Sequence, residues 1–105
     1  MSFAEIEKHV KFLILFGSIL NNPKDANDID LLAVVDKRAF KQIDEIVSKM
    51  QKTQAKKIHL IDITEAEFTQ ELINRNKAYL DAIKKGIILF GQENLIKFIG
   101  DLNSA

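Results

Sequence analysis

The chain has 105 residues, enough for one compact domain and too few for two, and its 47% apolar content argues against global disorder. Its 15 basic and 15 acidic side chains balance to a net charge of zero, which argues against a protein that coats nucleic acid. Cysteine is absent, which excludes disulfides, thiolate catalysis and zinc sites built on sulfur, and no apolar run reaches the roughly 18 residues of a membrane span. We therefore expect one cytoplasmic domain over residues 1–105, without a membrane or nucleic-acid partner.

An amphipathic helix is predicted near the start of the chain. Ser2 and Glu5 have the three-residue spacing of a capping box, in which a hydroxyl and a glutamate satisfy each other's backbone N–H groups. Apolar side chains recur at helical intervals and predict one buried face: Phe3, Ile6 and Val10.

Two buried strands with a polar loop between them follow. Residues 12–16, FLILF, form a short apolar run that ends at Gly17 and is typical of a strand covered on both faces. Residues 21–27, NNPKDAN, are turn formers and include the chain's one proline. Residues 28–36, DIDLLAVVD, are rich in branched side chains and predict the second strand. The length of the connection leaves the relative direction of these two strands open.

A helix, a third strand and a second capping box come next. Asp36 is placed to cap a helix of about 14 residues with one apolar face. Residues 58–63, IHLIDI, predict the strand. Thr64 and Glu67 then have capping-box spacing and open another helix. The lysines around the turn before this strand form either a local basic patch or an ordinary solvated surface: Lys49, Lys52, Lys56 and Lys57.

The remaining segment predicts two more helices and a fourth strand. Asn74 and Asn76 are expected to interrupt the helix that begins at Thr64, and Gly86 suits the end of the helix that follows. Residues 87–90, IILF, predict a short strand, and residues 93–100 a terminal helix. The order of elements predicts an α/β fold of the α+β type, in which helices flank one small mixed β-sheet.

Two aspartates begin the second strand. Asp28 and Asp30 point to the same face of that strand, whereas Ile29 points into the core. Adjacent carboxylates repel each other, and a cation between them removes that cost. Magnesium prefers oxygen ligands and is usually held by one or two carboxylates together with substrate phosphates. The pair therefore indicates a divalent-metal site, although an isolated Asp-x-Asp is also typical of a strand start or a cap.

A Gly-Ser pair ends the first strand. Gly17 allows the backbone to approach a ligand closely, and Ser18 is placed to start a short helix at Ile19, whose N–H groups would bind phosphate. An isolated Gly-Ser pair is more often only a turn. Its combination with Asp28 and Asp30, each pair attached to an apolar strand, is more specific and indicates a nucleotide bound as its metal complex.

These residues resemble a known signature. An apolar residue and Gly-Ser, here Phe16-Gly17-Ser18, followed at a distance by Asp-apolar-Asp, is similar to the signature of the DNA polymerase beta superfamily of nucleotidyltransferases. The length resembles the minimal nucleotidyltransferases, and the resemblance extends over residues 11–90. It implies the nucleotidyltransferase fold, with Gly17 and Ser18 at the phosphates of a nucleoside triphosphate such as ATP, and with Asp28 and Asp30 as catalytic ligands of Mg²⁺.

The sequence departs from the family pattern at a third position. Active members usually carry another carboxylate on a later strand, in the order apolar-Asp-apolar-apolar, and the matching stretch here has His59 in that place. Asp62 lies three residues further on and is expected on the opposite face. Three alternatives follow: His59 substitutes for the carboxylate, Asp62 serves through a shifted register, or the third carboxylate is missing. Histidine binds metals but suits magnesium poorly.

The resemblance implies an enzyme that transfers AMP from ATP to a hydroxyl group in a magnesium-dependent reaction. Minimal nucleotidyltransferases are often encoded beside a helical HEPN-domain protein, as antitoxin and toxin, and some adenylylate a tyrosine of that partner. In a chain of 105 residues we expect the acceptor to be brought by such a partner or by another subunit.

Two alternatives belong to other functional classes. A nucleotidyltransferase-like domain that has lost activity would act as a binding module, and His59 favours this reading. A phosphoryl-transfer fold with Asp28 as nucleophile is disfavoured by the loop that separates Asp28 from the Gly-Ser pair. The apolar side chains of the terminal helix favour core packing, with a homo-oligomer interface as the alternative: Leu95, Ile96, Phe98, Ile99 and Leu102.

Overall fold

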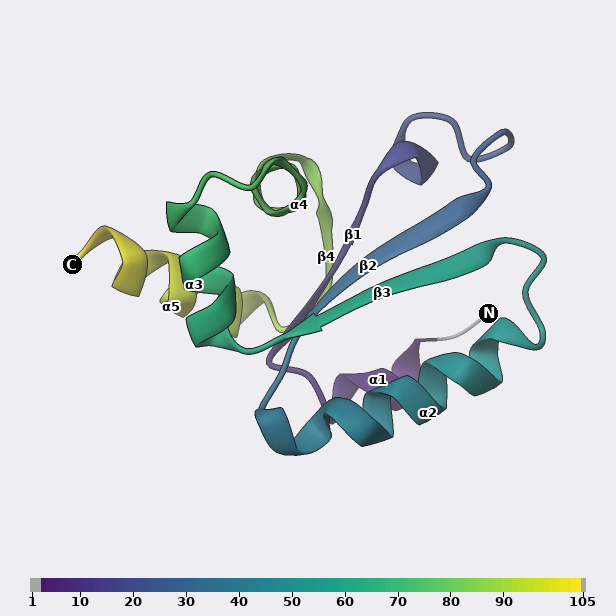
Figure 1. Cartoon of the computed structure of the whole chain (residues 1–105), viewed down its shortest axis with the longest axis horizontal. Helices are drawn as coiled ribbons and strands as arrows, with labels where there is room; N and C mark the ends of the chain where they lie inside the picture. Colours follow the sequence, from purple (N-terminus) through teal and green to yellow (C-terminus); the bar gives the residue numbers. More distant parts are fainter. Residues whose placement is uncertain (1–2, 105) are drawn as a thin grey trace.

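The computed structural model describes residues 3–104, and within this range a four-stranded sheet separates two groups of helices (Figure 1). The predicted capping residue Ser2 lies outside the described residues. The strands are β1 (Phe12–Phe16), β2 (Asp28–Val34), β3 (Lys57–Ile63) and β4 (Ile87–Phe90), in the spatial order β3-β2-β1-β4. β1 runs antiparallel to both β2 and β4, whereas β2 and β3 are parallel. The predicted mixed sheet with flanking helices is confirmed.

Helices α1 (Ala4–Glu7) and α2 (Phe40–Gln51) cover one face of the sheet (Figure 1). α2 is amphipathic, so that its apolar side chains pack on the sheet while its polar side chains face solvent. The buried residues of this layer are Ile6, Leu13, Ile29, Leu31, Ala33, Val35, Ile43, Val47 and Ile58.

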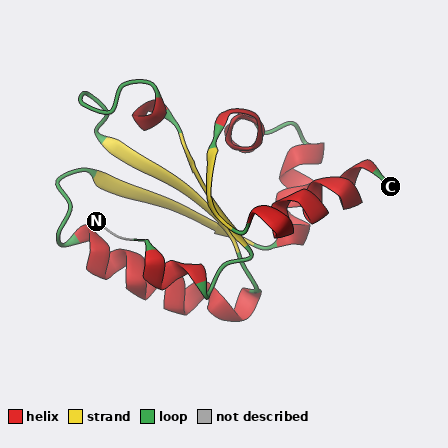
Figure 2. Cartoon of the chain, turned by 180° about the vertical axis from the view of Figure 1, so that it is seen from behind, coloured by secondary structure: helices red, strands yellow, loops and turns green. Residues whose placement is uncertain are grey.

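Helices α3 (Glu65–Ile73), α4 (Lys77–Lys85) and α5 (Gln92–Asn103) lie on the other face, as the view from behind also shows (Figure 2). Phe68 stacks on Phe98 with ring centroids 5.3 Å apart, and Phe12 of β1 packs against both rings. The buried residues of this second layer are Phe12, Ile14, Leu32, Val34, Ile63, Phe68, Ala82, Leu95 and Phe98.

Several predicted helix ends are wrong, and the reasons are local. α1 is a single turn that ends at Glu7, rather than a helix that extends to Val10. Asp36 does not cap α2: its side chain accepts an exposed bond from Arg38, and a 3₁₀ turn, η2 (Lys37–Ala39), precedes the helix. Gly86 does end α4, but with extended backbone rather than the left-handed conformation.

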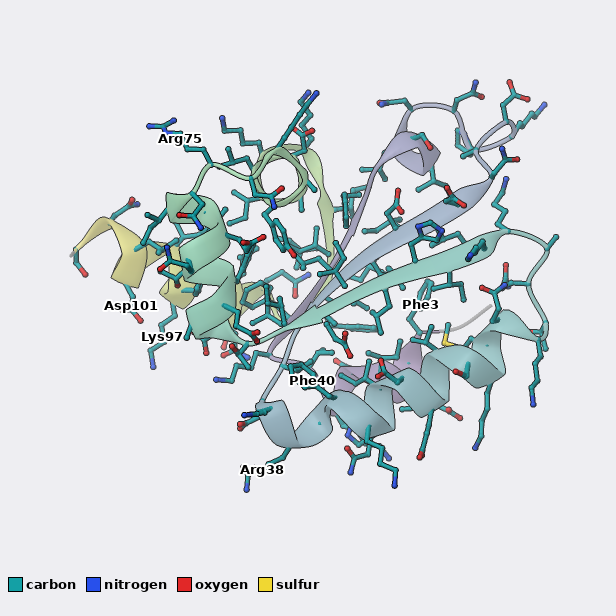
Figure 3. The ribbon with its side chains drawn as sticks, viewed as in Figure 1. Phe3, Arg38, Phe40, Arg75, Lys97 and Asp101 are labelled. Atoms are coloured by element: carbon teal, nitrogen blue, oxygen red, sulfur yellow. The ribbon has the colours of Figure 1, made fainter. Side chains whose placement is uncertain are left out.

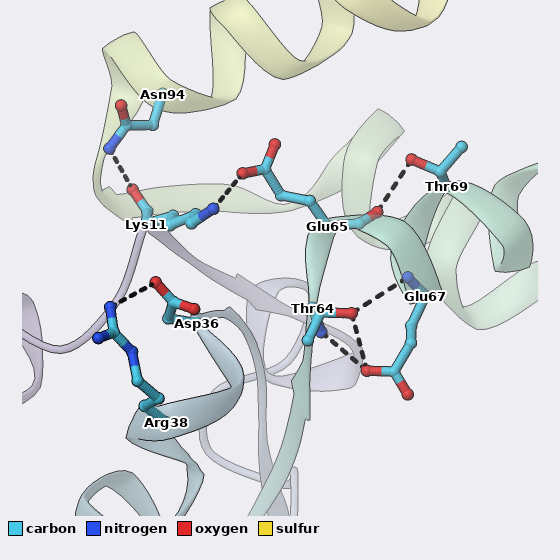
Figure 4. A network of polar contacts seen from close by, with 8 residues as sticks. All are labelled: Lys11, Asp36, Arg38, Thr64, Glu65, Glu67, Thr69 and Asn94. Atoms are coloured by element: carbon cyan, nitrogen blue, oxygen red, sulfur yellow. Dashed lines mark hydrogen bonds and ion pairs between the residues drawn. The ribbon is translucent and has the colours of Figure 1, made fainter.

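Polar contacts fasten α3 and α5 to the end of β1 (Figure 4). The Lys11 ammonium lies 2.6 Å from Glu65 Oε1, and the Asn94 side chain donates to the Lys11 carbonyl at 2.9 Å. The capping box predicted for Thr64 and Glu67 is confirmed, because each side chain accepts a bond from the backbone N–H of the other. These contacts hold α3 and α5 at the end of the sheet where β1 begins. Among residues 3–104, the helices are too short or too polar for any of them to cross a membrane.

Replacing Thr64 with alanine should lower the free energy of unfolding by about 1 kcal/mol, because the first turn of α3 loses its cap. Urea denaturation followed by circular dichroism measures the change. Thr69→Ala is the matched control: its hydroxyl bonds to the Glu65 carbonyl within the helix, and its loss should change the same quantity by less than about 0.5 kcal/mol. Equal losses in the two variants would contradict a specific role for the cap.

Candidate functional site

The register of the sheet brings three distant segments together. Asp30 of β2 pairs with Phe16 of β1 on one side and with His59 of β3 on the other. Gly17 follows Phe16 directly, so the Gly-Ser pair, the two aspartates and His59 meet at one end of the sheet. The connection between β1 and β2 extends beyond this end, away from α3 and α5 (Figure 1).

The two aspartates share one face of β2, as strand alternation predicted. Leu32 and Val34 lie on this same face and are fully buried in the layer of α3, α4 and α5. At the beginning of the strand this face is less buried by the helices: the Asp28 and Asp30 side chains keep exposed fractions of 43% and 26%. Ile29 points into the opposite layer and is buried. The same face of β2 is therefore buried in the core in its second half and carries two solvent-accessible carboxylates at its beginning.

His59 lies beside both carboxylates. Its Nε2 atom is 3.5 Å from Asp28 Oδ1, and its Nδ1 atom is 3.8 Å from Asp30 Oδ1. Both separations exceed the ordinary length of an N–H···O hydrogen bond, so the ring faces the aspartates without being tied to them. Of the two candidates for the third position, the structure therefore brings His59 to the aspartates.

The environment of Asp30 disfavours its charged form. Partial burial raises the pKa of the Asp30 carboxyl, and the nearby negative charge of Asp28 raises it further, while His59 acts in the opposite direction. The net effect is a raised pKa, as expected for a carboxylate that lacks a sufficient positive partner. A divalent cation between Asp28 and Asp30 would supply that charge.

Gly17 adopts a backbone conformation that other residues rarely reach, with φ 88° and ψ −165°. A Cβ atom at this position would lie only 2.2 Å from Asp30 Oδ2. The missing side chain of Gly17 therefore leaves the space into which the Asp30 carboxylate extends. This space explains why glycine stands at the end of β1. The position of the Asp30 carboxylate depends on the absence of a side chain at Gly17.

Ser18 begins the short 3₁₀ helix η1 (Ser18–Leu20) rather than preceding it, so the expected helix start at Ile19 is wrong by one residue. The Ser18 carbonyl accepts bonds from the N–H groups of Asn21 and Asn22, at 3.1 and 2.9 Å. Ser18 itself is exposed next to Gly17. Its position at the rim of the site is compatible with a contact to a bound phosphate.

Lys56 is a residue of this region that sequence reasoning missed, since it was assigned only to a surface patch. Its ammonium donates to the Ala26 carbonyl, and the neighbouring Lys57 N–H donates to the Asn27 carbonyl at 3.0 Å. These contacts hold the loop before Asp28 against the beginning of β3. No local signal in the sequence reveals them, because they depend on the parallel pairing of β2 with β3.

Asp62 lies away from the two aspartates. Because Asp30 pairs with His59, Asp62 pairs with Ala33 and faces α2, where its carboxyl is hydrogen-bonded to Asp44. The register that would bring Asp62 to the site is therefore not the one that the structure shows. Burial, followed by the hydrogen bond and the charge of Asp44, raises the pKa of Asp62 to about 6.

The donor atoms fit a cation that is completed by its substrate. Within residues 3–104, no group of three or more histidine, aspartate or glutamate side chains is arranged to hold a metal ion by itself. Two carboxylates on one face, one of them seated against Gly17, match the way in which Mg²⁺ is bound by one or two carboxylates, waters and substrate phosphates. Asp28 and Asp30 are therefore the residues that would hold such an ion.

The comparison with protein families agrees with this geometry. A model described as polymerase beta, nucleotidyltransferase matches residues 1–94. The chain belongs to this nucleotidyltransferase family. Its general activity class is thus that of a transferase, and the observed mixed sheet with flanking helices is consistent with the nucleotidyltransferase fold. Neither the curated proteins nor the solved structures that were compared contain a match.

The two arginines of this nucleotidyltransferase lie outside the site (Figure 3). Arg38 stands before α2 with a side chain that is 90% exposed, and Arg75 lies in the exposed turn between α3 and α4. The cations in this region are instead lysines, with Lys57 paired to Asp28 in the register of the sheet. The structure therefore assigns neither arginine to a bound phosphate.

Gly17→Ala should destabilise the fold by about 1–3 kcal/mol, since alanine disfavours this backbone conformation, and it should also displace Asp30. Urea denaturation gives the first effect and metal titration the second. Gly100→Ala is the matched control: a Cβ there meets no atom within 4 Å, and alanine is the better helix former, so stability should be unchanged or increased. A Gly17→Ala protein with unchanged stability would contradict the claim that the Asp30 carboxylate occupies the space beside Gly17.

The Asp44–Asp62 pair predicts a pH dependence of stability. Since the pKa of Asp62 rises from its ordinary 3.8 to about 6 on folding, the native state holds an extra proton between these values, and stability falls as pH rises through this window. Asp62→Asn should remove this slope, so the variant should gain stability over the parent at about pH 8 but not at about pH 3.5. Urea denaturation across this range measures the slope, with Asp101→Asn as control. A slope that persists in Asp62→Asn would contradict the assignment.

Proposed function

We propose that the domain transfers a nucleoside monophosphate, AMP from ATP, to a hydroxyl group in a reaction that requires Mg²⁺. The observation that supports this most directly is the convergence of Gly17, Asp28 and Asp30 at one end of the sheet in a chain of the polymerase beta nucleotidyltransferase family. Asp28 and Asp30 would hold the metal, while Gly17 and Ser18 would lie against the phosphates.

The reaction is a displacement at the α-phosphorus of ATP. The oxygen of the acceptor hydroxyl forms a bond to this phosphorus, the bond to the oxygen that bridges to the β-phosphate breaks, and pyrophosphate leaves with the bonding electrons. The hydroxyl proton passes to solvent. A bound Mg²⁺ supplies charge neutralisation for the phosphate oxygens. The carboxylates of Asp28 and Asp30 would fix the position of this charge, and the absence of a side chain at Gly17 leaves room for the Asp30 carboxylate.

The acceptor that we propose is a hydroxyl group on a protein partner, a tyrosine of a HEPN-type helical protein, with the domain acting as its antitoxin. The open site supports an acceptor of protein size, since the Asp28, Asp30 and His59 side chains keep exposed fractions of 43%, 26% and 47%. The exposed Ile96 and Ile99 of α5 would be available for contact with such a partner or with a second copy of the chain.

A binding module without catalysis is the second candidate. The specific observation in its favour is that His59 occupies the place next to Asp30 where active relatives carry a carboxylate. In this case the domain would bind nucleotide and partner, and its effect would come from contact alone.

Asp28→Asn and Asp30→Asn should each reduce transfer at least about 100-fold, because each removes a charged ligand of the proposed metal. The measurement is incorporation of α-labelled AMP from ATP into the HEPN-type protein, with Mg²⁺ and with EDTA. Asp101→Asn, an exposed aspartate of α5, is the control and should leave transfer unchanged.

Isothermal titration with Mg²⁺ and a nonhydrolysable ATP analogue separates the two candidates. Loss of label together with loss of nucleotide binding in the aspartate variants supports the enzyme. Nucleotide binding without any incorporation in the unaltered protein supports the module. Incorporation that survives in the Asp28→Asn, Asp30→Asn double variant would rule out this site as the catalytic centre.

A further inference from the structure

We infer that the Gln51 side chain closes the free edge of β3 and prevents a second copy of the chain from adding to the sheet there. This inference concerns assembly and does not depend on the proposed function. The strand order leaves two outer edges, β3 and β4 (Figure 1). β4 has only four residues and its pairing with β1 is irregular, whereas β3 is a regular strand of seven residues. The edge of β3 is therefore the longer template for another strand.

The hydrogen bonds between β2 and β3 show which backbone groups of β3 face outward. Lys57 N–H donates to the Asn27 carbonyl at 3.0 Å, and the Ile63 carbonyl accepts from Val35 N–H at 2.9 Å. The pairing between these two points has no shift in register, so every second residue from Lys57 to Ile63 bonds to β2. The residues whose backbone groups point away from the sheet are therefore those between them: Ile58, Leu60 and Asp62.

Gln51, the last residue of α2, occupies the first part of this edge. Its Oε1 atom accepts a bond from Ile58 N–H at 2.7 Å, and its Nε2 atom donates to the Lys56 carbonyl at 3.1 Å. These are the two bonds that one residue of a parallel neighbouring strand would make with its own carbonyl and N–H. The Gln51 amide thus takes the place of a strand and satisfies backbone groups that would otherwise be open.

This contact removes pairing that a second copy would need. Two β3 strands related by a two-fold axis would pair antiparallel, and when centred on Leu60 they would place Ile58 of each copy opposite Asp62 of the other. The Ile58 N–H is already bonded to Gln51, so in this register only the Leu60 pair keeps both of its bonds. A register centred on Ile61 avoids Ile58, but it brings the two Asp62 carboxyls to diagonal positions, where like charges repel.

Amide hydrogen exchange of the unaltered chain, measured by NMR, tests the contact directly. The N–H groups of Ile58 and Leu60 both point outward, but among residues 3–104 only that of Ile58 has a partner at the edge. After correction for intrinsic rates, the Ile58 amide should exchange at least about tenfold more slowly than the Leu60 amide. Equal exchange at the two positions would overturn the role of Gln51.

Sedimentation equilibrium tests the consequence for a second copy. Gln51→Ala should lower the dissociation constant of a dimer at least about tenfold relative to the unaltered chain, because the Ile58 N–H becomes free to pair. The Leu60 amide of this variant should also become more protected from exchange as the protein concentration rises. Gln51→Met, which keeps the length of the side chain without its bonds, repeats the measurement if Gln51→Ala does not fold.

Gln70→Ala is the matched control, because this glutamine of α3 bonds only to the Asn74 side chain on an exposed surface. Its loss should leave the dissociation constant unchanged, and circular dichroism confirms that each variant is folded. A folded Gln51 variant that associates no more strongly than the parent would overturn the inference. A dimer in which the Leu60 amide stays unprotected would do the same, since association would then occur through another surface.

Discussion

The position of β2 between an antiparallel and a parallel neighbour is the constraint on which the site depends. Leu31, Leu32, Ala33 and Val34 are all fully buried, alternately in the two helical layers. A slip of one residue would exchange the two faces of the strand and would drive the aspartates into an apolar layer, at a cost of several kcal/mol for each unpaired charge. Hydrophobic burial in the second half of β2 thus determines where the carboxylates at its beginning are presented.

The same strand accounts for the division of the molecule into a packed end and an open end. Where β1 begins, α3 and α5 are held by the aromatic cluster around Phe68 and by the Lys11–Glu65 ion pair (Figure 4). At the other end of the strand, Gly17 adopts a conformation that is unfavourable for most residues and Asp30 resists ionisation. Unfavourable features gather at functional sites when the rest of the fold is stable enough to maintain them. The packed end therefore provides the stability that the open end lacks.

Much of the fold could be predicted from local signals in the sequence. The strands, the Thr64–Glu67 capping box and the break at Asn74 and Asn76 all rest on neighbouring residues, and the structure confirms them. The predictions for the end of the first helix and for Asp36 as a helix cap were wrong because the competing local conformations differ little in free energy. Neither the direction of β1 relative to β2 nor the contact of Lys56 with the loop could be predicted, since both arise from pairing between distant segments.

The candidate site could also be predicted only in part, because it depends on pairing between distant segments. Gly17, Asp28 and Asp30 were predicted from their pattern, and the sheet brings them together. The choice between His59 and Asp62 required the register of β3, because residues three positions apart lie on opposite faces and either face could have met the aspartates. Once that register is known, Asp62 belongs to the packing of α2 and His59 to the site.

The presence of His59 also changes the electrostatics that a nucleotide would meet. An imidazole in place of a third carboxylate removes one negative charge from the site. The attraction for a divalent cation is weaker, but so is the repulsion of a triphosphate, which carries several negative charges itself. A site with this balance would bind a cation chiefly together with its nucleotide rather than alone.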